Sequence, residues 1–147
     1  MAGSVLIDTG VILALLDRSD KWHKPCVEAY NTTPLPLLTT EAVLAEVFHL
    51  TYRNLRDVQG VWRLLRSGAI RMCSIENDEL PQIQALMDNY ADHPMDFADA
   101  TLVHLAARES LSLILTVDHD DFETYRIGGR KRFSILPSRK ATFPLRS

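Results

Sequence analysis

Short apolar runs alternate with longer amphipathic stretches along the chain. Runs rich in Val, Ile and Leu indicate buried strands, and longer stretches with apolar residues three and four positions apart indicate helices. The runs predict strands at Ser4–Ile7, Leu35–Leu38, Ile70–Ile75, Leu113–Val117 and Phe133–Leu136. The amphipathic stretches predict helices at Gly10–Leu16, Trp22–Tyr30, Glu41–Tyr52, Asp57–Arg66, Asp78–Tyr90 and Asp96–Ser110. This alternation is typical of an α/β fold with a mainly parallel sheet.

Length and composition place the chain in a broad class. Its 147 residues are the size of one ordinary domain, so we expect residues 1–147 to form a single domain. Cys26 and Cys73 match no metal-ligand spacing and indicate free, reduced thiols. No apolar run is long enough to span a membrane, and Met1–Ser4 lacks the basic residues of a signal peptide. These features predict a cytoplasmic protein without a membrane contact.

Charge is distributed unevenly along the chain. Residues 1–124 carry all 19 acidic residues and 9 basic ones, whereas residues 125–147 carry 7 basic residues, Arg146 among them, and no acidic one. An acidic body with a basic end suits a cation site beside a contact with a polyanion. The alternative is a basic tail that is simply solvated. Arg130, Lys131 and Arg132 follow the flexible pair Gly128–Gly129, so we expect them on a loop.

Two carboxylates follow predicted strands directly. Asp8 comes after the run that ends at Ile7, and Asp118 comes after the run that ends at Val117. In an open parallel sheet, ligands bind at the carboxyl ends of the strands, which is where both side chains should lie. Taken singly, each aspartate could instead cap the helix that follows it.

Two further carboxylates border apolar faces of predicted helices. Glu46 shares a helix face with Val43 and Leu50, and Asp99 opens the apolar stripe of its own helix. A carboxylate beside an apolar face costs free energy unless its charge is offset, although Glu46 could also point outward into water. Asp96 follows Pro94 and is expected to be the N-cap, which leaves Asp99 free for another role.

These four acids, from four separate segments, can meet at one end of one sheet. They would repel one another without a cation, and Mg²⁺ is usually held by carboxylates, water and phosphate. Such a site can activate water for phosphodiester cleavage. The five histidines show no spacing that indicates zinc. The pattern therefore predicts a divalent-metal site formed by Asp8, Glu46, Asp99 and Asp118.

Four motifs in order resemble a known family. They are Ile7-Asp8-Thr9-Gly10, the glutamate-bearing stretch 41–47, the stretch 96–106 with Asp96 and Asp99, and the stretch 115–122 with Asp118. Together they resemble the PIN-domain family, and most of all the VapC-like toxin nucleases and their solitary relatives. The resemblance extends from Val5 to Leu136, nearly the whole chain.

The resemblance implies a three-layer α/β/α sandwich with a parallel five-stranded sheet. It implies Mg²⁺- or Mn²⁺-dependent cleavage of RNA, with Asp8, Glu46, Asp99 and Asp118 as the acidic quartet. Thr9 and Thr116 would be supporting hydroxyls that position a ligand or water, and Asp96 would have a less regular supporting role. We expect direct hydrolysis by water, since no serine or cysteine stands in a recognisable nucleophile motif. Arg130, Lys131 and Arg132 would then contact RNA phosphates rather than take part in the chemistry.

The resemblance also implies partners. It implies a homodimer, and in a toxin pair an antitoxin, whose existence the sequence leaves open. The chain offers Trp22, Tyr30, Trp62 and Leu65 as candidate interface residues, although all four could equally pack inside.

Two other functions remain as alternatives. One is a non-catalytic PIN-like protein that binds RNA or serves as a scaffold. The other is an Asp-based phosphatase or a receiver domain. A phosphatase of the haloacid-dehalogenase type would have a second aspartate two residues after the first, and that position is Gly10 here.

Overall fold

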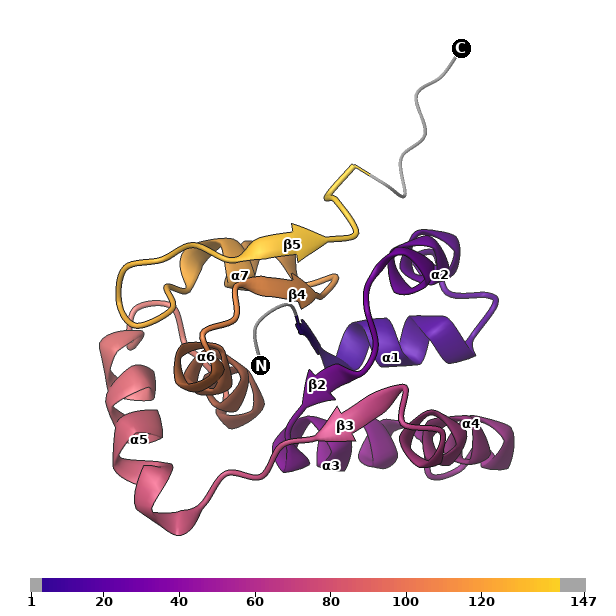
Figure 1. The fold of residues 1–147 in the computed structure, drawn as a ribbon, viewed down its shortest axis with the longest axis horizontal. Coiled ribbons are helices and arrows are strands. Elements are labelled where there is room, and N and C mark those ends of the chain that lie inside the picture. The colour runs from indigo at the N-terminus through magenta and orange to yellow at the C-terminus, as the bar shows by residue number, and fades with distance from the viewer. Residues whose placement is uncertain (1–3, 141–147) are drawn as a thin grey trace.

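A computed structural model describes residues 4–140, and its centre is a sheet of five short strands (Figure 1). The strand order is β3-β2-β1-β4-β5, and every neighbouring pair is parallel. The strands are β1 (Val5–Ile7), β2 (Leu37–Thr39), β3 (Ile70–Met72), β4 (Leu113–Leu115) and β5 (Ser134–Leu136). The expectation of a parallel five-stranded sheet is therefore confirmed, with the first strand at its centre.

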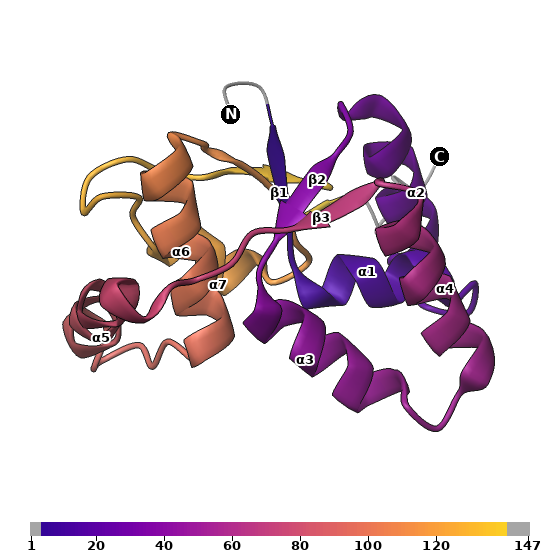
Figure 2. The same cartoon turned by 60° about the horizontal axis from the view of Figure 1, so that its bottom comes forward.

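Helices cover both faces of this sheet. They are α1 (Thr9–Leu16), α2 (His23–Thr32), α3 (Glu41–Thr51), α4 (Leu55–Arg66), α5 (Leu80–Asn89), α6 (Phe97–Glu109) and α7 (His119–Thr124), and a short 3₁₀ turn, Asn77–Glu79, precedes α5. Helices α1, α2 and α4 lie on one side and α5 and α6 on the other (Figures 1 and 2). Helix α3 packs against both α1 and α6. This arrangement is the expected α/β/α sandwich.

Polar side chains define where the central helices begin. Thr40 Oγ1 accepts a hydrogen bond from the backbone N–H of Val43 and starts α3. The carboxylate of Asp96 accepts one from the N–H of Asp99, at 2.8 Å, and starts α6. Each cap satisfies a backbone donor that has no partner within its helix. Both residues were expected as caps from their positions in the sequence.

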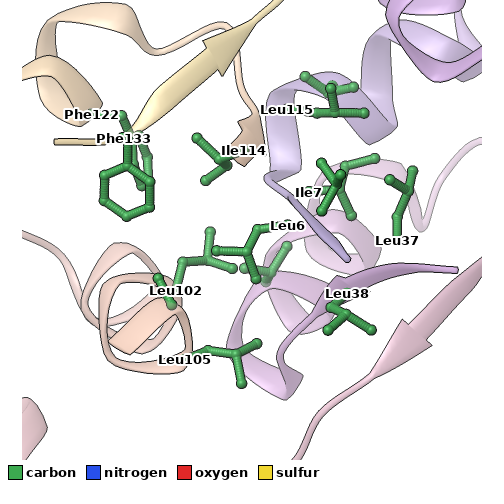
Figure 3. Close-up of a cluster of buried hydrophobic side chains, with 14 of the residues drawn as sticks. Leu6, Ile7, Leu37, Leu38, Leu102, Leu105, Ile114, Leu115, Phe122 and Phe133 are labelled. Carbon is green, nitrogen blue, oxygen red and sulfur yellow. The ribbon is translucent and has the colours of Figure 1, made fainter. Parts of the chain in front are cut away.

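The hydrophobic core lies where the strands meet α6 and the segments after β4. Leu6, Ile7, Leu37, Leu38, Ile114 and Leu115 of the strands pack with Leu102, Leu105, Phe122 and Phe133 (Figure 3). The strand residues are apolar without alternation because both faces of the sheet are covered. Full burial of one such side chain contributes roughly 1.5–3 kcal/mol, so the carboxyl ends of β1 and β4 are firmly held.

Some boundaries differ from the expected ones. Strand β3 ends at Met72 rather than Ile75, because the chain leaves the sheet there and the N–H of Ile75 donates to the carboxylate of Glu41 at 3.0 Å. Strand β4 ends at Leu115, and α7 follows where no helix was expected. Among the proposed interface residues Trp22, Tyr30 and Leu65 pack against the core, whereas Trp62 is 48% exposed.

Two smaller expectations concern thiols and membranes. Cys26 and Cys73 are free thiols, as expected. Among residues 4–140, no helix is both long and apolar enough to cross a membrane.

Candidate metal centre

The carboxyl edge of the sheet carries the predicted acidic residues. Asp8 follows β1, Asp118 lies three residues beyond β4, and the N–H of Asp8 donates to Leu115 O at 3.0 Å. This bond holds the two strand ends together. Around them is a cavity of about 390 Å³, lined by Asp8, Thr9, Gly10, Leu13, Glu46, Leu50, Asp96, Asp99, Val117 and Asp118. The structure thus places all four predicted acids, with Asp96 and Thr9, around one cavity.

Hydrogen bonds orient the carboxylate of Asp8, which is only 7% exposed. Its Oδ1 accepts from the N–H of Thr9 at 2.8 Å, and its Oδ2 accepts from Thr116 Oγ1 at 2.9 Å. Thr116 Oγ1 in turn accepts from the N–H of Asp118 at 3.0 Å. Asp8 is therefore both the cap of α1 and a cavity residue, and Thr116 links it to Asp118.

Glu46 reaches the cavity from the middle of α3. Its Oε1 accepts a hydrogen bond from Thr9 Oγ1 at 2.6 Å, which ties α3 to the start of α1. Val43 is buried on the same helix, but Leu50 is 58% exposed at the rim of the cavity. The expected apolar border of Glu46 is therefore present on one side only, because the end of α3 extends past the core.

Asp99 and Asp96 have separate roles at the start of α6. Asp96 caps the helix, as described above. Asp99 is 8% exposed, and its Oδ2 accepts a hydrogen bond from the buried hydroxyl of Tyr125 at 3.0 Å. Asp99 therefore does not form a capping box and points toward the cavity and Tyr125.

A third aspartate, Asp121, lies close to two of the predicted ones. Carboxylate oxygens of Asp99, Asp118 and Asp121 all lie within 4.8 Å of one another. His93 Nε2 lies 2.7 Å from Oδ1 of Asp121. Sequence reasoning missed both Asp121 and His93. The available signal was the three-residue spacing of Asp118 and Asp121, which places both on one side of a helix if α7 is foreseen.

Burial and like charges raise the pKa values of three aspartates of the cavity. Burial raises the pKa of Asp8 to about 6, and the charges of Glu46 and Asp96 add to this shift. Burial also raises the pKa of Asp99 to about 8, with further contributions from Asp8 and Asp96. The pKa of Asp118 is raised by burial and by its neighbour Asp121.

No lysine or arginine among residues 4–140 forms an ion pair with Asp8, Glu46, Asp99 or Asp118. The negative charge of the cavity is therefore uncompensated by the described protein. A donor set made only of carboxylate oxygens fits a hard divalent cation such as Mg²⁺ or Mn²⁺.

A family model described as the PIN domain matches residues 5–127. This chain belongs to the PIN-domain family. The matched range includes every acidic residue of the cavity and also Asp121, and it ends before Arg130. A comparison with curated protein sequences gives no significant match.

Solved structures share the fold of this PIN domain. VapC20 of Mycobacterium tuberculosis, a toxin that cleaves the sarcin-ricin loop, superposes with a TM-score of 0.71 at 20% sequence identity, covering 80% of this chain and 92% of the toxin. A chain from a toxin–antitoxin complex of Klebsiella pneumoniae superposes with a TM-score of 0.65 at 18% identity, covering 82% of this chain and 92% of that one.

The basic residues after α7 lie away from the acidic cavity of the PIN domain. Arg130, Lys131 and Arg132 are exposed on the turn before β5. Ser134 at the start of β5 pairs with Leu113 at the start of β4, so this turn is at the amino edge of the sheet, opposite Asp8. Their expected contact with RNA stays a prediction. Arg146 lies outside the described residues.

Proposed function

We propose that this PIN domain is a metal-dependent endoribonuclease that hydrolyses RNA phosphodiester bonds and acts as the toxin of a toxin–antitoxin pair. The observation that carries the proposal is the group of uncompensated carboxylates around one cavity at the carboxyl edge of the sheet. Asp8, Glu46, Asp99 and Asp118 would hold Mg²⁺ or Mn²⁺, and Asp121 lies close enough to contribute.

A bound divalent ion would supply Lewis acidity, which activates water and neutralises charge on the phosphate. The residues of the chain would orient the carboxylates that hold the ion. Thr116 Oγ1 fixes the orientation of Asp8, and Thr9 Oγ1 holds Oε1 of Glu46. Oε2 of Glu46 has no partner among the described residues and is available to accept a hydrogen bond from a water molecule in the cavity.

Water is the nucleophile that this cavity favours. No serine, cysteine or lysine lines it, and the hydroxyls of Thr9 and Thr116 already donate to carboxylates. The cavity is also partly open at the exposed Leu50, so a polymer can approach it from the α3 side. A phosphate group brought there would lie beside the carboxylates that would hold the metal ion.

The partners of the proposed enzyme follow from the family and from the two structural neighbours. RNA is the proposed substrate, and a small antitoxin protein is the proposed inhibitor. One neighbour is a toxin that cleaves an RNA loop and the other comes from a toxin–antitoxin complex, which supports both parts of the proposal. The homodimer stays a prediction, to be checked by sedimentation velocity at micromolar concentration.

Activity against total RNA tests the proposal. The purified protein is incubated with total RNA in Mn²⁺ and in EDTA, and new RNA ends are mapped by sequencing. We expect discrete cleavage with Mn²⁺ only, and loss of cleavage in Asp8→Asn. Asp88→Asn, which changes an exposed aspartate on α5, is the matched control and should cleave normally. Full activity of Asp8→Asn, or cleavage unaffected by EDTA, would contradict the assignment. Mn²⁺ binding without any cleavage would instead favour the non-catalytic alternative.

A further inference from the structure

A second recess lies beside strand β3, away from the carboxylates. It has a volume of about 800 Å³, and its apolar lining comes from Leu44 and Phe48 of α3, Trp62 and Leu65 of α4, and Ile70 and Met72 of β3. Trp62 is 48% and Met72 47% exposed. The rings of Phe48 and Trp62 lie 5.1 Å apart, so the tryptophan is held in place by its neighbour although it faces water. We call this recess the β3 groove.

The strand that borders the β3 groove is an edge of the sheet (Figure 2). Ala69 O accepts from the N–H of Leu37 at 2.8 Å, and the N–H of Cys73 donates to Thr39 O at 2.7 Å. Residues 69, 71 and 73 therefore turn their backbone groups toward β2. Because these groups alternate along a strand, the N–H and C=O of Ile70 and Met72 point away from the sheet. No other described residue pairs with them, so they can accept an added strand.

Arginine is concentrated in the stretch that contains α4 and leads into β3, within a protein whose residues 1–124 are strongly acidic. Residues 53–71 contain one acid, Asp57, and five arginines: Arg53, Arg56, Arg63, Arg66 and Arg71. All five arginines are exposed, and none forms an ion pair within residues 4–140. Arg71 lines the groove, and Arg66 follows Trp62 by one turn of α4, so these two arginines form what we call the positive rim of the groove. Glu41 also lines the groove, but its carboxylate accepts the N–H of Ile75.

We infer that the β3 groove binds an extended, acidic segment of a protein partner, in which apolar residues alternate with Asp or Glu. The apolar side chains fill the groove around Trp62, the acidic ones meet Arg66 and Arg71, and the backbone pairs with Ile70 and Met72. A second copy of this chain would bring the same positive rim, and like charges across an interface are repelled. RNA would match the charge but has no apolar side chains for the recess and no peptide backbone to pair with the strand.

This inference is independent of the proposed nuclease activity, because no residue of the β3 groove belongs to the acidic cavity. Its test is a selection from a displayed library of random dodecapeptides on the full protein. Arg66→Glu/Arg71→Glu serves as the counter-target. We expect enrichment of peptides with net negative charge and alternating apolar residues.

The enriched peptides are then measured one by one against variants. Trp62→Ala and Arg66→Glu/Arg71→Glu should each weaken binding by about tenfold or more, as expected for a buried anchor and for charge pairs in an interface. Arg18→Glu reverses an exposed arginine in the turn between α1 and α2 and should leave affinity unchanged. Amide hydrogen exchange should show new protection at Ile70 and Met72, whereas Arg71, which already faces β2, should change little.

Several results would overturn the inference. One is a selection that enriches no peptide, or enriches basic ones. Another is a set of enriched peptides whose binding ignores both variants or leaves the exchange at Ile70 and Met72 unchanged. A third is single-stranded RNA that displaces the peptides and gives the same protection, which would make the rim a nucleic-acid contact. A fourth is a dimer that dissociates in Arg66→Glu/Arg71→Glu, which would make the groove a contact between copies.

Discussion

Replacing the ionisable carboxyl of Asp99 with an amide should stabilise the metal-free protein at neutral pH. The substitution is Asp99→Asn, which keeps the shape of the side chain and an oxygen that can accept from the hydroxyl of Tyr125. In the folded protein the pKa of Asp99 is raised from 3.8 to about 8, chiefly by burial. A raised pKa means that the contribution of this group to stability is complete below pH 4 and is lost as the pH rises through about 8.

The size of the effect follows from the two pKa values. Each unit of difference between the unfolded and the folded pKa corresponds to about 1.4 kcal/mol. Between pH 3 and pH 7, Asp99 therefore lowers the free energy of unfolding by about 4 kcal/mol. The amide introduced by Asp99→Asn does not titrate, so the variant should be more stable than the parent by an amount of this order at pH 7. The advantage should shrink as the pH falls toward 4. For a chain of this length, about 4 kcal/mol corresponds to a rise in Tm of roughly 10 °C.

The assay is thermal and urea unfolding in EDTA buffer between pH 4.5 and 8. Asp88→Asn is the control, because it removes an exposed aspartate from α5. Added Mn²⁺ should raise the Tm of the parent and raise that of Asp99→Asn much less, since a ligand stabilises only the state that binds it. Stability curves of parent and variant that run parallel across this pH range would refute the reasoning, because the pKa of the Asp99 carboxyl would then not be raised in the folded protein.

Three further predictions concern the surroundings of the site. Tyr125→Phe removes the hydrogen bond to Asp99 Oδ2 and should raise the pKa of Asp99 further. The affinity for Mn²⁺ at pH 7, measured by calorimetry, should therefore fall several-fold. Unchanged affinity would show that the hydrogen bond is not needed for metal binding. A Cβ on Gly10 would lie 2.6 Å from Val117 Cγ2, so Gly10→Ala should lower the free energy of unfolding in urea by about 1–3 kcal/mol. Adding Val117→Ala should restore part of the lost stability. If it does not, the clash with Val117 is not the cause. Replacing Arg130, Lys131 and Arg132 with alanine in an Asp8→Asn background should weaken RNA binding and flatten its salt dependence; coincident curves would leave these residues as a solvated turn.

The parts of the site that follow strands could be predicted from the sequence. Asp8 directly follows an apolar run, Asp118 follows one that only Thr116 interrupts, and the carboxyl ends of parallel strands meet at one edge. Asp96 could be assigned as a cap because the cap depends on neighbours only three residues away. These inferences need only local sequence and one rule of sheet topology, and the structure agrees with them.

The parts that depend on packing between distant segments could not be predicted. Helix α7 has six residues and buries only His119 and Phe122, so it lacks an apolar period, and without it Asp121 has no assigned place. His93 reaches Asp121 from 28 residues away, a contact that no local pattern encodes. Leu50 has the spacing of a core residue, but α3 runs beyond the sheet at that point, and the side chain faces water.

The central position of β1 has a consequence for synthesis of the protein on the ribosome. This strand is made first, and it pairs on one side with β2, which follows within about 30 residues, and on the other with β4, which begins only at Leu113. At about 5–20 residues per second, the nascent chain waits roughly 5–20 s for that second partner. Until then one side of β1 is unpaired, and Asp8 lacks Thr116 and Asp118. The acidic cavity therefore cannot be completed until β4 and the residues that follow it, and so nearly all of the domain, have been translated.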